Sequence, residues 1–443
     1  MSPARSLGLT VCGLLLPVLT GLGLYQQQRE DTAAFVAIAL VQGAVFAVAA
    51  ALVWRGSGSR RVLVPILAVA AAMRLTLLFA PPYLSTDIFR YVWDGRVLAA
   101  GINPYRYIPI DPHLEDLRDA EIFPNINRNN YAPTIYPPAA QAIFFAATRF
   151  GESVTVMKAA MLVFEAAAVG LLLQMLIAAG QPPVRILVYA WHPLPAWEFA
   201  GSGHIDAALL FFVVLALWAN RRLPGWAAGL ALAGAVLTKL YPLVLFPAVW
   251  PRWNWRMPLA FCLAIVLAYL PFLGVGWGVL GFLPGHMAEE GFSGGGAGFY
   301  LWGVARSLLP LAGAPVLVYV AGAALLLLSL GLFVAFRPSD TASQRRAAAL
   351  LAGAFVLLLS PHYPWYFAWL VVFACLIPCA SLLWLTLASF LLYLVPVGAQ
   401  LVADRHRLIV ESIIYVPFMV VAAIELWRQR RREPVRDAEH APR

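Results

Sequence analysis

The chain has 443 residues, of which 62% are hydrophobic and 12% charged, and its mean hydropathy is +0.77. Because a soluble domain carries roughly 25% charged residues, this composition excludes an ordinary soluble fold. The formal net charge is +9, but the arginines cluster between apolar runs and are not interleaved with aromatic residues on one basic face. The charge therefore indicates contact with membrane lipids and no nucleic-acid partner.

Apolar runs recur along the whole chain, and no alternating strand pattern competes with them. Since about 20 helical residues cross a hydrocarbon core of roughly 30 Å, the sequence predicts an all-α, polytopic transmembrane helix bundle of about 12–14 spans. The expected spans lie near residues 8–24, 33–54, 62–80, 154–178, 184–200, 204–220, 257–275, 315–336, 347–360, 364–378, 380–400 and 407–427. The run 224–250 is broken by Lys239-Leu-Tyr-Pro242, which predicts two short helices that enter and leave from the same side.

The arginine clusters predict the orientation of the spans, because loops rich in arginine stay in the cytoplasm. These clusters lie at Arg55–Arg61, Arg221–Arg222, Arg252–Arg256, Arg345–Arg346 and Arg428–Arg432. We expect a single integral membrane domain over residues 1–443, with both termini and a basic tail, 428–443, in the cytoplasm. The segments that then face the other side are 81–138, 276–299, 360–366 and 402–407.

The loop 81–138 is the longest polar segment, at about fifty residues, and loops of this length are usually functional or disordered. It is rich in tyrosine, phenylalanine and tryptophan, which argues for an ordered segment at the membrane interface. Within it, Ser85-Thr86-Asp87 predicts the start of an interfacial helix, with Ser85 or Thr86 as its cap and Gly101 as its end.

Two carboxylates lie on this predicted helix. Asp87, Tyr91, Asp94 and Leu98 share a face, and Arg90 is within one helical turn of both aspartates. One interpretation is a network of surface ion pairs on an interfacial helix. The other is that one aspartate acts as a general base, held at the helix N-terminus where the helix dipole favours its ionised form.

The same residues carry a resemblance to a known family. The motifs are Ser85-Thr86-Asp87-Ile-Phe-Arg-Tyr91-Val-Trp-Asp94-Gly95, Ala99-Ala-Gly-Ile-Asn103-Pro104-Tyr105 and Tyr136-Pro-Pro138. They resemble the GT-C superfamily of membrane glycosyltransferases, particularly the bacterial polyprenyl-phosphate-mannose-dependent mannosyltransferases. Weaker motifs follow along the chain in the same order as in the family. They are His192-Pro193 with Glu198, Gly203-His204-Ile-Asp206, Lys239-Leu-Tyr241-Pro242 and His362-Tyr363-Pro364-Trp365-Tyr366.

The resemblance implies a function. Asp87 corresponds by position to the family's proposed catalytic base. The resemblance therefore implies transfer of a sugar, which is mannose in the mannosyltransferases named above, from a polyprenyl-phosphate donor to a hydroxyl of a glycolipid or glycan, with inversion at the anomeric carbon. The resemblance also places the site on the extracytoplasmic side of the bacterial inner membrane and implies no metal and no other cofactor. The four cysteines lie in apolar runs, so the residues themselves indicate neither a disulfide framework nor a zinc site.

In addition to the base, such a transfer needs cations that hold the phosphate of the leaving group. Lys239, Arg405, His406 and Arg407 are candidates, with His362 as a further donor, although the Arg405–Arg407 group equally suits lipid headgroups. The other candidate substrate-binding residues are Arg90, Tyr91, Asp94, His204, Asp206 and Tyr241. The pair Glu289-Glu290 precedes a glycine-rich stretch, 292–298, which is either a mobile lid over the acceptor or a solvated loop without a role.

Two alternatives remain open at this stage. A transporter or flippase of a lipid-linked saccharide also needs many spans, but its polar residues normally line a path at the bilayer midplane between repeated halves. Here they gather at one face, and the halves show no obvious repeat. The second alternative is an assembly subunit without activity of its own.

Overall fold

The computed structural model describes residues 3–54, 62–250, 252, 254–292, 298–309, 315–336, 340–395 and 405–439. In these ranges the chain contains helices and no strand. The prediction of an all-α, polytopic helix bundle is therefore confirmed. Arg55, Arg60 and Arg61, residues 293–297 of the glycine-rich stretch, and the end of the basic tail lie outside the described residues.

Seven helices within these ranges are long and apolar enough to cross a membrane. They begin with α1 (Pro3–Gln28), α2 (Thr32–Trp54) and α6 (Val154–Ala178), and continue with the segment that starts at α12 (Arg256–Tyr269), α15 (Val316–Phe336), α16 (Thr341–Leu359) and α19 (Arg405–Glu439). The shorter apolar helices include α3 (Leu63–Leu78), α5 (Pro138–Thr148), α9 (Asp206–Ala219), α10 (Gly225–Val236) and α18 (Ala380–Ala388).

Between α6 and α9 the expected span 184–200 forms a series of short pieces. They are η4 (Pro183–Ile186), α7 (Leu187–Ala190), α8 (Pro193–Pro195) and the π-helical η5 (Ala196–Gly201). Two prolines interrupt the backbone hydrogen bonding of this segment, because proline has no N–H. Every side chain from Val184 to Ala200 is buried, so this irregular backbone is enclosed by protein, as the bilayer requires.

The remaining elements are short and complete the bundle. The run after α10 breaks at Lys239, as expected, and returns through η6 (Tyr241–Leu245) and α11 (Phe246–Val249). The others are η2 (Pro112–Leu117), η3 (Phe123–Asn125), η7 (Leu270–Leu280), α13 (Leu283–Glu289), α14 (Tyr300–Leu308), η8 (Pro364–Phe367), α17 (Leu370–Leu376) and η9 (Ser389–Leu394).

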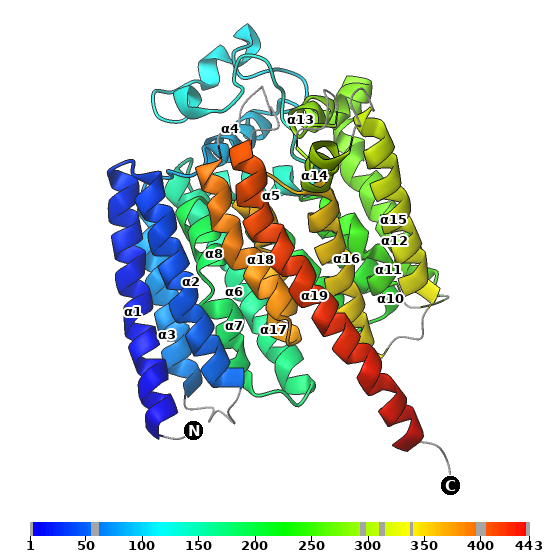
Figure 1. The fold of residues 1–443 in the computed structure, drawn as a ribbon. Coiled ribbons are helices and arrows are strands. Elements are labelled where there is room, and N and C mark those ends of the chain that lie inside the picture. Colours follow the sequence, from blue (N-terminus) through cyan, green and yellow to red (C-terminus); the bar gives the residue numbers. More distant parts are fainter. Residues whose placement is uncertain are drawn as a thin grey trace.

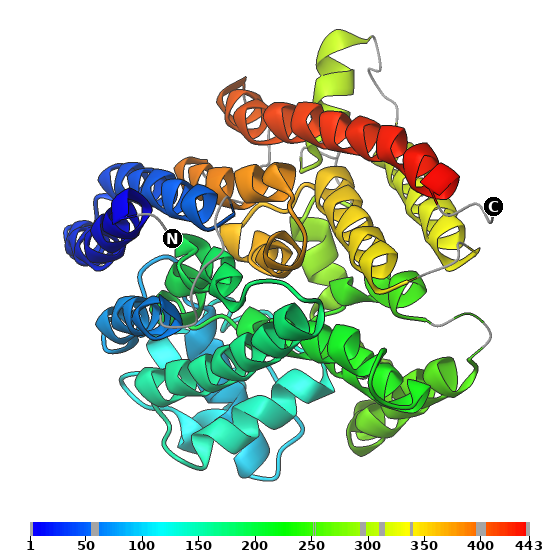
Figure 2. The ribbon, with the colours of Figure 1, turned by 90° about the horizontal axis from the view of Figure 1, so that it is seen from below.

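The long loop lies at one end of the bundle, which we call the Asp87 face. Helix α4 (Asp87–Ala99) lies across that end, with the irregular part of the loop above it and α13 beside it (Figure 1). The start of α1 and the last turns of α19 lie at the opposite end. Seen from that opposite end, α19 runs along one edge of the bundle beside α16 and α18, while α1 and α2 form another edge (Figure 2).

Buried polar anchors hold the helices at the base of this loop. Arg74 of α3 forms an ion pair with Glu165 of α6 at 2.6 Å, and Tyr189 of α7 donates to the same carboxylate. Lys158 of α6 donates to the carbonyls of Leu77 and Ala80 at the end of α3. Because an unpaired polar group is costly inside a membrane, these contacts fix α3, α6 and α7 relative to one another.

Candidate active site

Helix α4 begins at Asp87 and ends at Ala99, and Gly101 follows with φ +77°, which a residue with a Cβ rarely adopts. The expected limits are therefore confirmed. The oxygen of Ser85 accepts a hydrogen bond from the Asp87 N–H at 3.2 Å, whereas Thr86, the residue at the cap position, makes no side-chain cap bond. Asp87 thus stands in the first turn of α4, where free N–H groups and the helix dipole stabilise a carboxylate.

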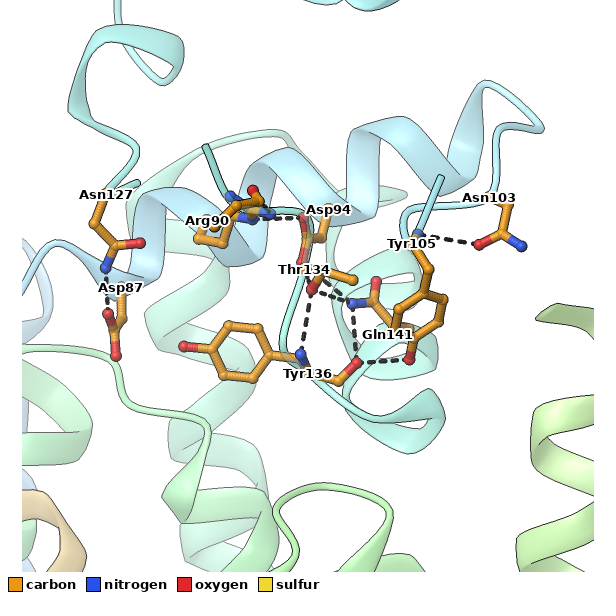
Figure 3. Close-up of polar contacts among 10 residues, drawn as sticks. Asp87, Arg90, Asp94, Asn103, Tyr105, Asn127, Thr134, Tyr136 and Gln141 are labelled. Carbon is orange, nitrogen blue, oxygen red and sulfur yellow. Dashed lines mark hydrogen bonds and ion pairs between the residues drawn. The ribbon is translucent and has the colours of Figure 1, made fainter. Parts of the chain in front are cut away.

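The Asp87 carboxylate is held by one amide. Nδ2 of Asn127, from the irregular part of the long loop, donates to Asp87 Oδ1 over 2.6 Å (Figure 3). The other oxygen, Oδ2, lies 4.0 Å from Nδ1 of His204, which is longer than a formed hydrogen bond. The Asp87 side chain is 19% exposed. One oxygen is oriented and the other remains available to a ligand.

Gly203, directly before His204, packs against α4. This glycine has φ +73°, and a Cβ on it would lie 2.2 Å from the Ile88 side chain of α4. A larger residue would strain the backbone here and require the Ile88 side chain to move. The His204 ring stacks on Trp365, with centroids 4.1 Å apart, and Trp365 in turn stacks on Tyr363 at 4.3 Å.

On its other side, His204 faces a second buried carboxylate. Nε2 of His204 lies 3.5 Å from Oε2 of Glu198, and the other oxygen of Glu198 accepts a hydrogen bond from Tyr393 at 2.7 Å. Neither ring nitrogen of His204 has a hydrogen-bond partner among the described residues. The imidazole therefore stands between the carboxylates of Asp87 and Glu198 without being bonded to either.

Asp206, the first residue of α9, joins two of the other candidates. Nζ of Lys239 lies 2.6 Å from Oδ2 of Asp206, and the hydroxyl of Tyr241 donates to Oδ1 over 2.8 Å. The ammonium group of Lys239 also lies 4.8 Å from the centre of the Tyr366 ring. The Lys239 side chain is 11% exposed, so a ligand at this face can reach it beside its paired carboxylate.

Helix α13 brings further charges to the same face. The guanidinium of Arg128 donates three hydrogen bonds to the carboxylate of Glu289, the shortest of them 2.6 Å, and the Tyr131 hydroxyl donates a fourth. One turn before Glu289, Nε2 of His286 lies 3.4 Å from the Tyr366 hydroxyl. The charges of Arg128, Asp87 and Lys239 all act on His286, which shows that the long loop, α4 and α13 converge here.

Glu290 and His362 form a buried pair next to this cluster. Oε2 of Glu290 lies 3.1 Å from Nδ1 of His362, and Nε2 of His362 lies 3.1 Å from the Gly298 carbonyl. Burial raises the pKa of Glu290 to about 7, although the charges of Arg407 and Arg128 oppose the rise. Burial also lowers the pKa of His362 to about 3. Both shifts favour the neutral form of each group, and a carboxyl with a pKa of about 7 is half ionised at pH 7.

The three basic residues at the start of α19 have different surroundings. Arg405 and His406 are exposed. Arg407 is buried and forms an ion pair with Glu411 at 2.8 Å, and it also donates to the Gly298 carbonyl. Arg407 is thus connected to His362 through Gly298, while Arg405 and His406 lie on the surface.

The middle of α4 is sealed from solvent. Arg90 pairs with Asp94 at 3.0 Å, not with Asp87, and donates to the Ala132 carbonyl. Thr134 and Gln141 also donate to Asp94 (Figure 3). Both members of the pair are buried. These contacts support a structural role for Arg90 and Asp94.

The neighbouring aromatic residue and the Asn-Pro-Tyr motif are also internal. Tyr91 is buried and stacks on Phe144 of α5, with centroids 4.6 Å apart. A Cβ on Gly95 would lie 2.5 Å from the Phe144 carbonyl oxygen, so α4 and α5 pack with their backbones close together. Asn103 accepts from the Tyr105 N–H, and the Tyr105 hydroxyl donates to the Tyr136 carbonyl.

The structure thus brings together six of the predicted residues, namely Asp87, His204, Asp206, Lys239, Tyr241 and His362, and places Arg407 beside them. It adds Asn127, Arg128 and His286, which sequence reasoning missed. The spacing of His286 to Glu289 and Glu290, at i+3 and i+4 on one short helix, was a signal for the last of these. Asn127 and Arg128 had none, because they lie in irregular backbone.

A comparison with known protein families finds a match. A family model described as alpha-(1->6)-mannopyranosyltransferase, N-terminal domain, matches residues 6–255 of the 443-residue chain. The matched segment is more than half of the chain and includes Asp87, Asn127, His204 and Lys239. No curated protein and no solved structure matches the chain.

Proposed function

The chain belongs to the alpha-(1→6)-mannopyranosyltransferase family and is a multi-pass membrane glycosyltransferase, and from this premise we propose the reaction that it performs. It transfers mannose from a polyprenyl-phosphate donor to a hydroxyl of a glycolipid or glycan acceptor on the extracytoplasmic face of the bacterial inner membrane. Asp87 is the general base. Because the family's description names an α-(1→6)-mannopyranosyltransferase, the proposed new bond is α-(1→6), and the acceptor atom is then the oxygen on carbon 6 of the acceptor sugar.

The observation that carries this proposal is the contrast between Asp87 and the acidic residues around it. Asp94, Asp206 and Glu289 each lie within 3.0 Å of an arginine or lysine nitrogen. Among the residues that the structure describes, Asp87 has only the Asn127 amide as a hydrogen-bond donor, with His204 at 4.0 Å, and it is partly exposed. A carboxylate that is oriented but not neutralised by a bonded cation keeps an oxygen free to accept a proton.

The chemistry follows from this position. Asp87 removes the proton of the acceptor hydroxyl while the oxygen forms a bond to the anomeric carbon of the donor. The bond between that carbon and the phosphate oxygen breaks, and the electron pair leaves with the polyprenyl phosphate. Inversion at the anomeric carbon gives an α product from a β-linked donor.

Two cations of the surrounding cluster suit the phosphate of the leaving group. Lys239 is partly exposed, and Arg128 interacts electrostatically with Asp87. Both are already paired with carboxylates, which hold them in place before the donor binds. Arg405 and His406, exposed at the start of α19, suit the lipid headgroups around the donor's entry.

The test is the Asp87→Asn variant in proteoliposomes that contain polyprenyl-phosphate mannose and a mannoside acceptor. The asparagine oxygen still accepts from Asn127, but the side chain no longer accepts a proton. We expect transfer to fall about 10²–10⁴-fold, the usual contribution of a general base. Asp116→Asn, which changes an exposed carboxylate in the same loop, is the matched control and keeps full activity. Full activity of Asp87→Asn would refute the base assignment.

A further inference from the structure

A second cluster of charged side chains lies at the end of the bundle opposite the Asp87 face. It consists of Arg185 in η4, Arg221 and Arg222 directly after α9, and Arg345 in the first turns of α16. Helix α9 starts at Asp206 in the active site and ends at Ala219, so the arginines that follow it lie a full helix length away. We call these four residues the arginine cluster.

Two members of the arginine cluster are buried without enough hydrogen-bond partners. Arg185 is 6% exposed and Arg345 is 7% exposed. Arg185 donates to Gln181 through one terminal nitrogen, but its Nε and its other terminal nitrogen have no partner among the described residues. Arg345 donates to the Met175 carbonyl, and its Nε has no partner there either. A guanidinium has five N–H groups, and leaving buried ones unbonded is costly.

The charges of the cluster also repel one another. Arg345 interacts electrostatically with Arg222, Arg185 and Arg221. In the described part of the chain no carboxylate pairs with Arg185 or Arg345. The carbonyls at the C-terminal end of α6, including Met175, offset part of the charge. Asp340 interacts with Arg221 and Arg346, but its side chain is occupied in capping α16 through the Ser343 N–H.

Two tryptophan rings next to the arginine cluster indicate its depth in the membrane. The guanidinium of Arg185 lies 5.5 Å from the Trp54 ring at the end of α2, and that of Arg222 lies 5.4 Å from the Trp218 ring of α9. Tryptophans at helix ends are typical of the membrane interface, at the level of lipid headgroups. An anion that reaches this level meets the guanidinium groups of Arg185 and Arg345, whose N–H donors are not all used by the described residues.

We propose that the arginine cluster is a binding site for a phosphate group, with Arg185 and Arg345 as its main ligands. The planar guanidinium fork matches phosphate oxygens, and basic pockets between transmembrane helices are suited to anionic headgroups. The phosphate comes either from an anionic phospholipid in the surrounding leaflet or from free phosphate in solution. This site is separate from the transferase site and does not depend on the proposed reaction.

The experiment measures thermal unfolding of the full-length protein in detergent with two probes. The first is phosphatidylglycerol, compared with phosphatidylcholine at the same concentration. The second is inorganic phosphate, compared with chloride at the same ionic strength. We expect at least one of the two probes to raise the midpoint temperature of unfolding of the wild type, because a ligand that binds only the folded state stabilises it. Stabilisation by phosphatidylglycerol alone identifies a lipid, and stabilisation by inorganic phosphate identifies a soluble ligand.

The variants Arg185→Gln and Arg345→Gln separate binding from folding. Without a probe they unfold at or above the wild-type temperature, since each removes a buried charge that no carboxylate among the described residues neutralises. With the probe they lose the stabilisation, which corresponds to at least a tenfold weaker apparent affinity. Arg346→Gln, next to Arg345 but exposed, is the matched control and keeps the response.

Two results would overturn the proposal. One is a wild type that responds to neither probe, or whose response persists in the Arg185→Gln, Arg345→Gln double variant. The other is an equal loss of stabilisation in Arg346→Gln, which would indicate general electrostatic attraction to the surface and not binding at the arginine cluster. If the variants fail to fold, native mass spectrometry of the wild type decides, because the proposal requires one phosphate-bearing ligand retained per chain.

Discussion

Asp87 and Asp94 lie two turns apart on the same helix, and their surroundings differ in every respect that matters for chemistry. Asp87 is in the first turn, partly exposed and held by one amide. Asp94 is buried and accepts from Arg90, Thr134 and Gln141. The first carboxylate has one oxygen without a hydrogen bond to any described residue, while the second uses its oxygens to hold the long loop and α5 on α4. Position along one helix thus separates a candidate base from a structural ion pair.

The strongest test of this contrast, after Asp87→Asn, is Asp94→Asn. The amide cannot neutralise Arg90, so a buried charge is left uncompensated, and we expect a loss of about 3–5 kcal/mol in the free energy of unfolding. Thermal or denaturant unfolding in detergent measures this loss, and Asp87→Asn unfolds like the wild type in the same assay. The contrast fails if Asp94→Asn is as stable as the wild type but inactive, since Asp94 would then act in the reaction.

A smaller effect is expected from Asn127→Ala. This variant removes the hydrogen bond that orients Asp87 and leaves the carboxylate in place. Because a misoriented catalytic group slows the chemical step, kcat falls about 10- to 100-fold, with little change in KM for the donor. Initial-rate kinetics distinguish the two constants. Asn130→Ala, an exposed asparagine in the same segment, is the control, and an equal loss there would mean that the loop as a whole was disturbed.

The smallest effect concerns pH and Glu290. Burial raises the pKa of this carboxyl to about 7, so it is mainly neutral below that pH and mainly negative above it. Besides the negative Glu289, the charges that act on it are those of the cations Arg407, Arg128 and Lys239. A negative Glu290 weakens their attraction for the donor phosphate, so KM for the donor rises several-fold as pH increases from about 6 to about 8, the range around that value.

The variant Glu290→Gln removes this titration. We expect its KM for the donor to stay low and nearly constant over the same pH range. Glu121→Gln, an exposed carboxylate of the long loop, retains the wild-type profile. A KM that still rises through pH 7 in Glu290→Gln would assign the titration to another group.

Much of the fold was predictable from the sequence, because hydropathy and helix signals are local. Long apolar runs determine α-helices in a membrane, where each backbone group must find its partner within the same segment. The expected span 154–178 coincides with α6, and the limits of α4 follow from Asp87 and Gly101. The expected span 184–200 was less accurate, since its prolines divide it into short pieces whose geometry depends on their neighbours.

The candidate base was also visible in the sequence, because the motif around Asp87 follows directly after an apolar run. Its companions were only partly visible. The residues at the ends of apolar spans, His204, Asp206 and Lys239, were identified because a charged group at such a position is unusual. Asn127 and Arg128 were missed, because nothing in a loop without helical periodicity predicts which side chain turns back toward α4.

What the sequence determined by itself is therefore the class of the protein, the course of its spans and the helix that begins at Asp87. The tertiary structure alone decided that Arg90 pairs with Asp94 and not with Asp87, that Lys239 pairs with Asp206, and that His362 meets Glu290. The physical reason is distance along the chain. Helix formation and membrane insertion depend on neighbouring residues, whereas an ion pair between distant segments depends on how the whole bundle packs.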